Sequence, residues 1–251
     1  MADLDFYFDP VCPFAWMTSK WVRIVAGRRH YDVDWRFISL RLVNADVDYA
    51  THFPAGYERG HTAGLELLRV AAAVRSESGA EAVGRLYEAY GEEIFDSAPG
   101  RREELHRDPQ GFVAPILERL GLPVRSAGAV SDTSLDAEIR AETDHALGLT
   151  GRDVGTPILH FEPPEGKALF GPVISRLPSP GEAVELWDHV VALARFGGFA
   201  ELKRSLRETP QLRALGVDDA QVGVEEDWQQ GHRRDAATAS SEPTAADAPL
   251  R

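Results

Sequence analysis

The spacing of apolar residues changes twice along the chain, and this change limits the possible folds more than any other feature. Near the amino terminus two segments alternate as strands do, namely Leu4, Phe6 and Phe8, then Val33, Trp35 and Phe37. Between them apolar residues recur at helical spacing after Pro13, and Gly27 marks the expected helix end. The opening is therefore predicted to be a strand–helix–strand unit.

The middle of the chain follows the helical period, and the strand pattern then returns. Four helical stretches are predicted, around Leu65–Ala72, Val83–Ile94, Phe112–Leu120 and Ala137–Leu147. Short strands are expected at Ile158–Phe161 and Ala168–Phe170, and Ser179, Pro180 and Glu182 predict a capped helix start.

This order predicts an α/β protein with a thioredoxin fold and a helical insertion domain. Residues 1–43 and 151–210 are expected to form the thioredoxin-like domain, and residues 44–150 the helical insertion. Few large apolar residues follow Asp218, so residues 218–251 are expected to be a disordered acidic tail.

Charge and residue content exclude several partners. The net charge of −13 over 251 residues disfavours nucleic acid and anionic membranes. The residues after Met1 resemble no signal peptide, which predicts a cytoplasmic location. One cysteine and scattered histidines predict no metal site, and no nucleotide-binding motif is present. His160 is interpreted as a half-buried strand residue with hydrogen-bond partners rather than a base.

Cys12 is the residue on which a chemical function would depend. It lies where a strand gives way to a helix, followed by Pro13 at the first helical position. At such a position the backbone N–H groups of Phe14 and Ala15 and the helix dipole favour the thiolate, which is the reactive form. The sequence therefore predicts a reactive Cys12 with a lowered pKa.

Ala15 stands where a dithiol site would carry its second cysteine. Any catalytic cycle must then take its second thiol from outside the chain, which predicts exchange with a low-molecular-weight thiol. Thr156-Pro157 is expected to be the cis-proline loop that lies beside Cys12. Asp9 is interpreted as a turn residue, with proton transfer to Cys12 as the alternative.

Four segments together resemble the mycothiol-dependent nitroreductase family of actinobacteria, a branch of the DsbA-like thioredoxin proteins. They are Phe8–Trp16, Val154–Pro157, Phe170–Val173 and Leu186–Asp188. The resemblance implies a thioredoxin fold with a helical insertion and mycothiol as co-substrate. It also implies that Asn44 and Tyr57 line the substrate cleft, with a surface or capping role as the alternative. The family motif C-P-W-C reads here Cys12-Pro13-Phe14-Ala15.

The leading hypothesis is a single-cysteine, thiol-dependent oxidoreductase that acts on a small electrophilic substrate. Cys12 would be catalytic, supported by Asp9, Pro13, Phe14, Ala15, Thr156 and Pro157. A second hypothesis is an isomerase or thiol transferase like 2-hydroxychromene-2-carboxylate isomerase and the kappa-class glutathione transferases, in which Cys12 forms no covalent bond. A third is a binding module or chaperone without enzymatic activity.

Overall fold

The computed structural model describes residues 2–98, 100–204, 206–216 and 225–227. Its strands are β1 (Leu4–Phe8), β2 (Val33–Phe37), β3 (Ile158–Phe161), β4 (Ala168–Phe170), β5 (Leu206–Glu208) and β6 (Glu225–Asp227). Its α-helices are α1 (Pro13–Arg29), α2 (Leu40–Val43), α3 (Tyr49–His52), α4 (Tyr57–Ser78), α5 (Ala80–Gly91), α6 (Arg101–Arg107), α7 (Pro109–Arg119), α8 (Asp136–Thr150) and α9 (Pro180–Arg195). A π-helix, η1 (Glu92–Asp96), extends α5, and 3₁₀ segments are η2 (Val124–Ser131), η3 (Thr133–Leu135) and η4 (Arg213–Leu215).

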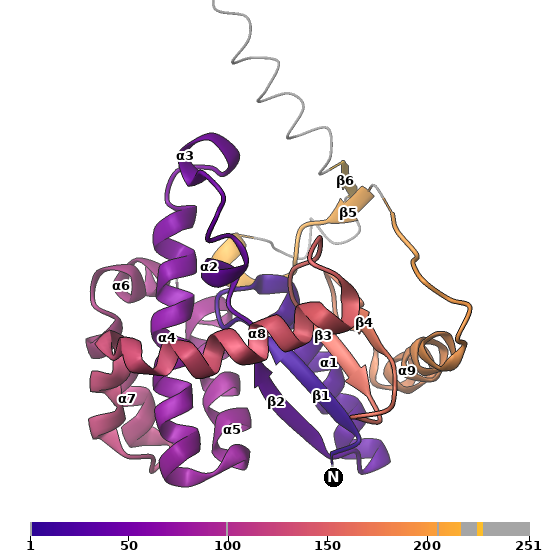
Figure 1. Ribbon diagram of the computed structural model, residues 1–251, viewed down its shortest axis with the longest axis horizontal. Helices are drawn as coiled ribbons and strands as arrows, with labels where there is room; N and C mark the ends of the chain where they lie inside the picture. Colours follow the sequence, from indigo (N-terminus) through magenta and orange to yellow (C-terminus); the bar gives the residue numbers. More distant parts are fainter. Residues whose placement is uncertain (1, 99, 205, 217–224, 228–251) are drawn as a thin grey trace, which may run out of the picture.

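The central sheet has the strand order β2-β1-β3-β4. β1 pairs with β2 in parallel and with β3 antiparallel, and β3 pairs antiparallel with β4. With α1 linking the parallel strands and α9 following β4, this is the thioredoxin fold. The helices α3 to α8 lie between β2 and β3 in the chain, where the helical insertion was expected, and the short α2 precedes them (Figure 1). The exact domain boundaries at residues 43 and 150 stay a prediction.

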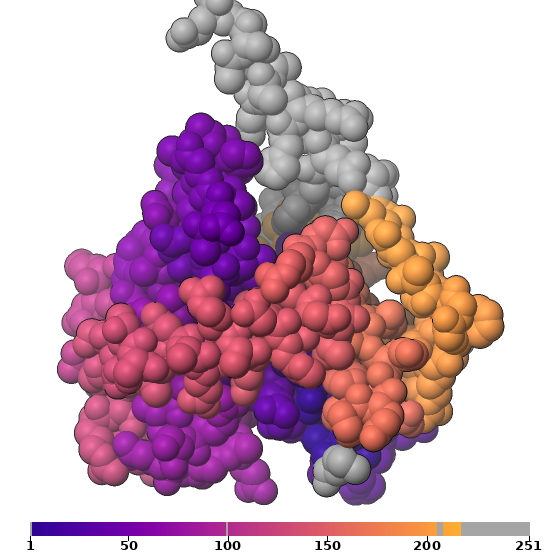
Figure 2. Space-filling view, viewed as in Figure 1, coloured from indigo at the N-terminus to yellow at the C-terminus, as the bar shows by residue number. Residues whose placement is uncertain are grey.

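Both faces of the sheet are covered. On one face α1 packs against α9, where the Trp21 indole donates to the Ala183 carbonyl at 2.8 Å. On the other face α8 crosses the strands and buries Tyr7 and Ile158 against Ala146 and Leu147. Figure 2 shows α8 as a continuous band over this face of the molecule.

This double cover buries β1 completely. Leu4, Phe6 and Phe8 alternate with Asp5 and Tyr7 along the strand, and all five residues are buried. The reason is that α8 removes the second face of β1 from solvent. A central strand of a doubly covered sheet is buried on both sides.

Helix ends follow the sequence signals in part. The capping box of α9 is confirmed, since Ser179 Oγ accepts from the Glu182 N–H at 3.4 Å and Glu182 Oε2 accepts from the Ser179 N–H at 2.9 Å. The predicted end of α1 at Gly27 is wrong. The helix continues to Arg29 and ends where His30 takes the left-handed conformation, at φ 54°.

His160 differs from its interpretation as a half-buried residue with satisfied partners. It is 1% exposed, and neither ring nitrogen has a hydrogen-bond partner within the described residues. Asp5 on the neighbouring strand is near, with Oδ2 at 3.9 Å from Nδ1. His160 is more buried than expected because both faces of the sheet are covered.

The acidic tail lies mostly outside the described residues, namely at 218–224 and 228–251. Within the predicted tail Glu225–Asp227 form β6 and pair antiparallel with β5. The disordered tail stays a prediction. Among the helices that the structure describes, none combines the length and the apolar character that a membrane span requires.

Candidate functional site

Cys12 occupies the N-cap of α1, as the sequence predicted. Its backbone is extended, at φ −85° and ψ 113°, and its Sγ accepts from the Ala15 N–H at 3.4 Å. The turn before it is closed by the Cys12 N–H, which donates to the Asp9 carbonyl at 3.1 Å. Pro13 and Phe14 are half-buried in the first turn of α1, and Ala15 is fully buried.

The loop before β3 lies against the sulfur. The Thr156-Pro157 peptide bond is cis, as expected, and the Cys12 thiol donates to the Thr156 carbonyl at 3.5 Å. Thr156 Oγ1 in turn donates to the Tyr7 carbonyl at 3.0 Å, which attaches this loop to β1. The structure therefore brings Cys12 and the cis-proline loop together across 144 residues of sequence.

The predicted lowering of the Cys12 pKa is wrong. Cys12 is 7% exposed, and this burial raises the pKa of the thiol to about 12. Hydrogen bonds from the Ala15 and Phe14 N–H groups act in the lowering direction, while the nearby Asp9 carboxylate raises the pKa further. The helix terminus is arranged as expected, but loss of solvation for the thiolate outweighs it, so the resting sulfur is a thiol.

Asp9 is fully buried and links the Cys12 turn to α2. Its Oδ1 accepts from the Val11 N–H at 3.0 Å, and its Oδ2 accepts from the Leu40 N–H at 2.7 Å, at the start of α2. Burial raises the pKa of this carboxyl to about 7, against the opposing effect of the two hydrogen bonds. These two hydrogen bonds agree with the interpretation of Asp9 as a turn residue. Proton transfer between Asp9 and Cys12 stays a prediction.

Gly64 in α4 makes room for that turn. A Cβ at this position would lie 2.5 Å from Asp9 Oδ1 and 2.9 Å from Val11 Cγ2. The insertion thus packs directly on the residues that precede Cys12. Sequence inspection did not single out Gly64, whose signal would have been a glycine in the middle of an apolar helix.

The structure places Asn44 and Tyr57 without testing their binding role. Asn44 is the C-cap of α2, and its Nδ2 donates to the Leu40 carbonyl at 2.8 Å, as a capping residue does. Tyr57 begins α4, is 48% exposed and stacks on Phe53 with ring centroids 5.7 Å apart. Their contribution to a substrate cleft stays a prediction.

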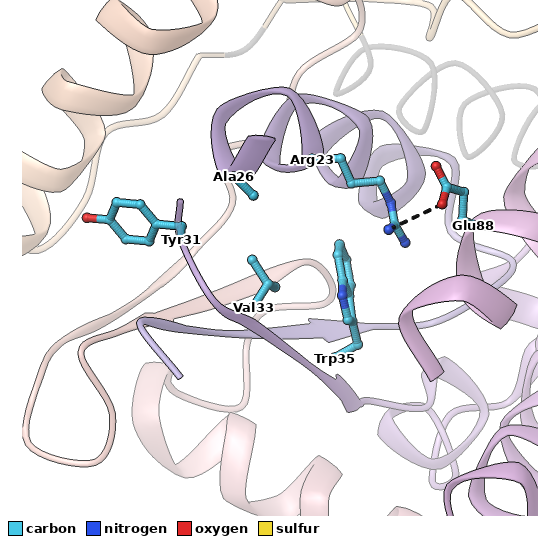
Figure 3. Close-up of a pocket in the computed structure, with 6 residues that line it drawn as sticks. All are labelled: Arg23, Ala26, Tyr31, Val33, Trp35 and Glu88. Atoms are coloured by element: carbon cyan, nitrogen blue, oxygen red, sulfur yellow. Dashed lines mark ion pairs between the residues drawn. The ribbon is translucent and has the colours of Figure 1, made fainter. Parts of the chain in front are cut away.

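A surface hollow of about 390 Å³ lies away from this turn, between α1, β2 and α5 (Figure 3). It is lined by Arg23, Ala26, Tyr31, Val33, Trp35 and Glu88. The Arg23 guanidinium lies 4.2 Å from the Trp35 ring centroid and pairs with Glu88 at 3.6 Å. No group of three or more His, Cys, Asp or Glu side chains suited to a metal ion occurs among the described residues.

The topology, the cis-proline loop and a cysteine at the N-cap of α1 define a thioredoxin-fold protein of the DsbA-like kind. The family model described as "Rv2466c-like: Mycothiol-dependent nitroreductase Rv2466c" matches residues 11–204, and the chain belongs to this family. The uncharacterized protein Rv2286c of Mycobacterium tuberculosis is 32% identical over 209 residues, which cover 81% of this chain and 82% of that protein. The description of the family names a mycothiol-dependent nitroreductase, which is a thiol-dependent oxidoreductase.

Two solved structures are similar at low identity. One is described as a protein-disulfide isomerase from Pseudomonas syringae, with a TM-score of 0.45 and 18% identity, covering 75% of this chain and 92% of that one. The other is a 2-hydroxychromene-2-carboxylate isomerase, with a TM-score of 0.38 and 15% identity, covering 76% of this chain and 96% of that one. Family membership therefore rests on the family model and on the mycobacterial relative.

Proposed function

We propose that this chain is a single-cysteine, thiol-dependent oxidoreductase in which Cys12 is the reacting group and mycothiol is the co-substrate. The observation that carries the proposal is the place of the Cys12 sulfur, 3.4 Å from the Ala15 nitrogen and 3.5 Å from the Thr156 oxygen before Pro157. This is the meeting point of helix terminus and cis-proline loop. A lone thiol fits a co-substrate that supplies the second sulfur, because Ala15 cannot.

The exchange balances with one protein sulfur. Cys12 loses its proton to solvent and attacks the sulfur of a mixed disulfide, forming an S–S bond to one half. The other half leaves as a thiolate and takes up a proton. A free low-molecular-weight thiol then attacks the sulfur bound to Cys12, so Cys12 is released and reprotonated. The net change is one mixed disulfide and one thiol converted into a reduced thiol and a symmetrical disulfide.

Within this reaction the protein's own residues position the sulfur. The Ala15 N–H points at Cys12 Sγ and stabilises negative charge there as the proton leaves. The Thr156 carbonyl holds the thiol proton at rest, and Asp9 fixes the turn between β1 and α1. Because the pKa of the buried thiol is about 12, the exchange should be slow until a bound partner alters the surroundings of Cys12.

The raised pKa also favours a second candidate function. A thiol that stays protonated can donate a hydrogen bond to a bound thiol or thiolate and activate it without forming a covalent bond. The protein would then act as an isomerase or thiol transferase. An electrophilic small molecule as substrate, and a location in the cytoplasm, belong to both proposals.

Intact-mass analysis after incubation with oxidised mycothiol, and separately with oxidised glutathione, tests the first proposal. The expected result is one mycothiol adduct per chain, absent from Cys12→Ser and removed by excess mycothiol. Turnover retained in Cys12→Ser, with no adduct on the wild type, would establish the non-covalent function instead. No adduct and no thiol-dependent turnover with either disulfide would favour the binding module.

A further inference from the structure

Trp16 joins the Cys12 turn to the helical insertion. Its backbone N–H donates to the Cys12 carbonyl at 3.0 Å, which is the first helical hydrogen bond of α1. Its side chain is 2% exposed and points into the insertion, where its indole N–H donates to Asp96 Oδ2 at 3.1 Å. Since both N–H groups belong to Trp16, a displacement of the indole would also shift the backbone N–H that is bonded to the Cys12 carbonyl.

Asp96 receives two groups from α1 on one oxygen. Besides the Trp16 indole, Lys20 Nζ lies 2.5 Å from the same Oδ2, and this ammonium is 5.0 Å from the Trp16 ring centroid. Asp96 is the last residue of η1, the π-helix that extends α5. Such wide turns within helices often occur at functional positions.

The Trp16 ring is also closely packed by α5, through Gly91 and Tyr87. A Cβ at Gly91 would lie 2.2 Å from Trp16 Cε3, so the helix backbone lies directly on the ring. On another side Tyr87 meets Trp16 edge to face, with ring centroids 5.9 Å apart, and stacks on Phe8 at 3.8 Å. Phe8 ends β1, immediately before Asp9, so these rings enclose the Cys12 turn from both of its ends.

We propose that Asp96 is a positioning residue for Cys12, acting through the indole N–H of Trp16. Packing against Gly91 and Tyr87 holds the ring plane, while the hydrogen bond to Asp96 fixes which edge of the indole faces the insertion. Together they keep the first turn of α1, and with it the sulfur, in its buried place. The inference rests on the proposed function only in taking Cys12 as the reacting group.

The test is the pH dependence of Cys12 alkylation by iodoacetamide, followed by intact mass, in the full-length protein. Asp96→Leu removes the acceptor and should expose the turn to water, so alkylation at pH 8 should accelerate at least tenfold and the apparent pKa of Cys12 should fall. Asp96→Asn keeps an acceptor oxygen and should retain the wild-type profile. Trp16→Phe, which keeps a ring but lacks the N–H, should reproduce the effect of Asp96→Leu.

Two comparisons separate positioning from simple stability. Lys20→Met removes the ion pair but leaves the indole bond, and it should leave the alkylation profile unchanged. The double variant Trp16→Phe/Asp96→Leu should show no further acceleration over either single variant. An unchanged profile in Trp16→Phe and Asp96→Leu, even with a lowered melting temperature, would overturn the proposal, as would a shift in Lys20→Met equal to that in Asp96→Leu. Alkylation needs no mycothiol, so failure of the proposed function would appear only in the adduct experiment.

Discussion

Replacing Gly64 by alanine tests whether the insertion holds the Cys12 turn in place. The added Cβ would lie 2.5 Å from Asp9 Oδ1, so the carboxylate or α4 must move by roughly 1 Å to reach ordinary contact. A displacement of that size breaks or weakens the hydrogen bonds of 3.0 and 2.7 Å that Asp9 accepts from Val11 and Leu40.

The expected change in the free energy of unfolding is the sum of three contributions. Overpacking costs about 1–3 kcal/mol, and a buried N–H left without its acceptor costs about 1–3 kcal/mol. Alanine regains about 1 kcal/mol of helix propensity over glycine. We therefore expect Gly64→Ala to lower the free energy of unfolding by about 1–5 kcal/mol, which for a chain of this size corresponds to a fall in melting temperature of about 2–20 °C.

Gly60→Ala is the matched control, because it is the same substitution one turn earlier in α4. A Cβ there would meet His106 at 3.7 Å, an ordinary contact. Its expected effect is a small stabilisation, by about 0.4–1 kcal/mol. Urea and thermal unfolding followed by circular dichroism measure both variants. A Gly64→Ala protein as stable as the Gly60→Ala protein would refute the inferred packing of α4 on Asp9.

Three further predictions concern protonation and capping. With a pKa of about 12, wild-type Cys12 should react with iodoacetamide at pH 8 about 30–100 times more slowly than a free cysteine. Its thiolate fraction is about a thousandfold smaller, and the higher nucleophilicity of its thiolate offsets part of this difference. The alkylation rate should rise about tenfold per pH unit from pH 7 to 10. An ordinary cysteine profile would contradict this. Because the pKa of Asp9 is raised, the native state binds the Asp9 proton more tightly than the unfolded chain does. The stability advantage of wild type over Asp9→Ala should therefore decline as pH rises from about 4 to about 7 and then level off. Denaturant titrations across that range would show a constant difference in the free energy of unfolding between the two proteins if Asp9 had an ordinary pKa. Ser179→Ala should lower the free energy of unfolding by about 1 kcal/mol, because it removes the N-cap of α9. Ser131→Ala is the control: Ser131 is not an N-cap residue, so its replacement should change the free energy of unfolding little. Equal effects of the two substitutions in urea titrations would argue against the stabilising role of the cap.

Local signals in the sequence predicted local structure well. Pro13 and Ser179 mark helix starts that the structure has, and the alternation in Val33–Phe37 gives β2. The order of strands and helices was enough to predict the thioredoxin fold. The cis bond at Pro157 was predicted from its place in that order.

Burial at the site could not be predicted in the same way, since it depends on residues far apart in sequence. The helix terminus at Cys12 is local, but the cover that raises its pKa comes from tertiary packing, including the loop at Thr156. Asp96 lies 80 residues from Trp16, and no pattern around either residue indicates the pair. His160 likewise loses solvent because α8 covers its sheet face.

The main buried cluster includes Phe6 and Trp35 of the sheet, Leu68 and Tyr87 of the insertion, and Trp187 of α9. The polypeptide leaves the sheet after β2 and returns at β3, yet the side chains form a single apolar interior. Cutting out the intervening helices would strip one side of that interior rather than detach an independent module. Thermal melting should accordingly be cooperative across the entire molecule, with the sheet and the inserted helices losing their structure in the same transition.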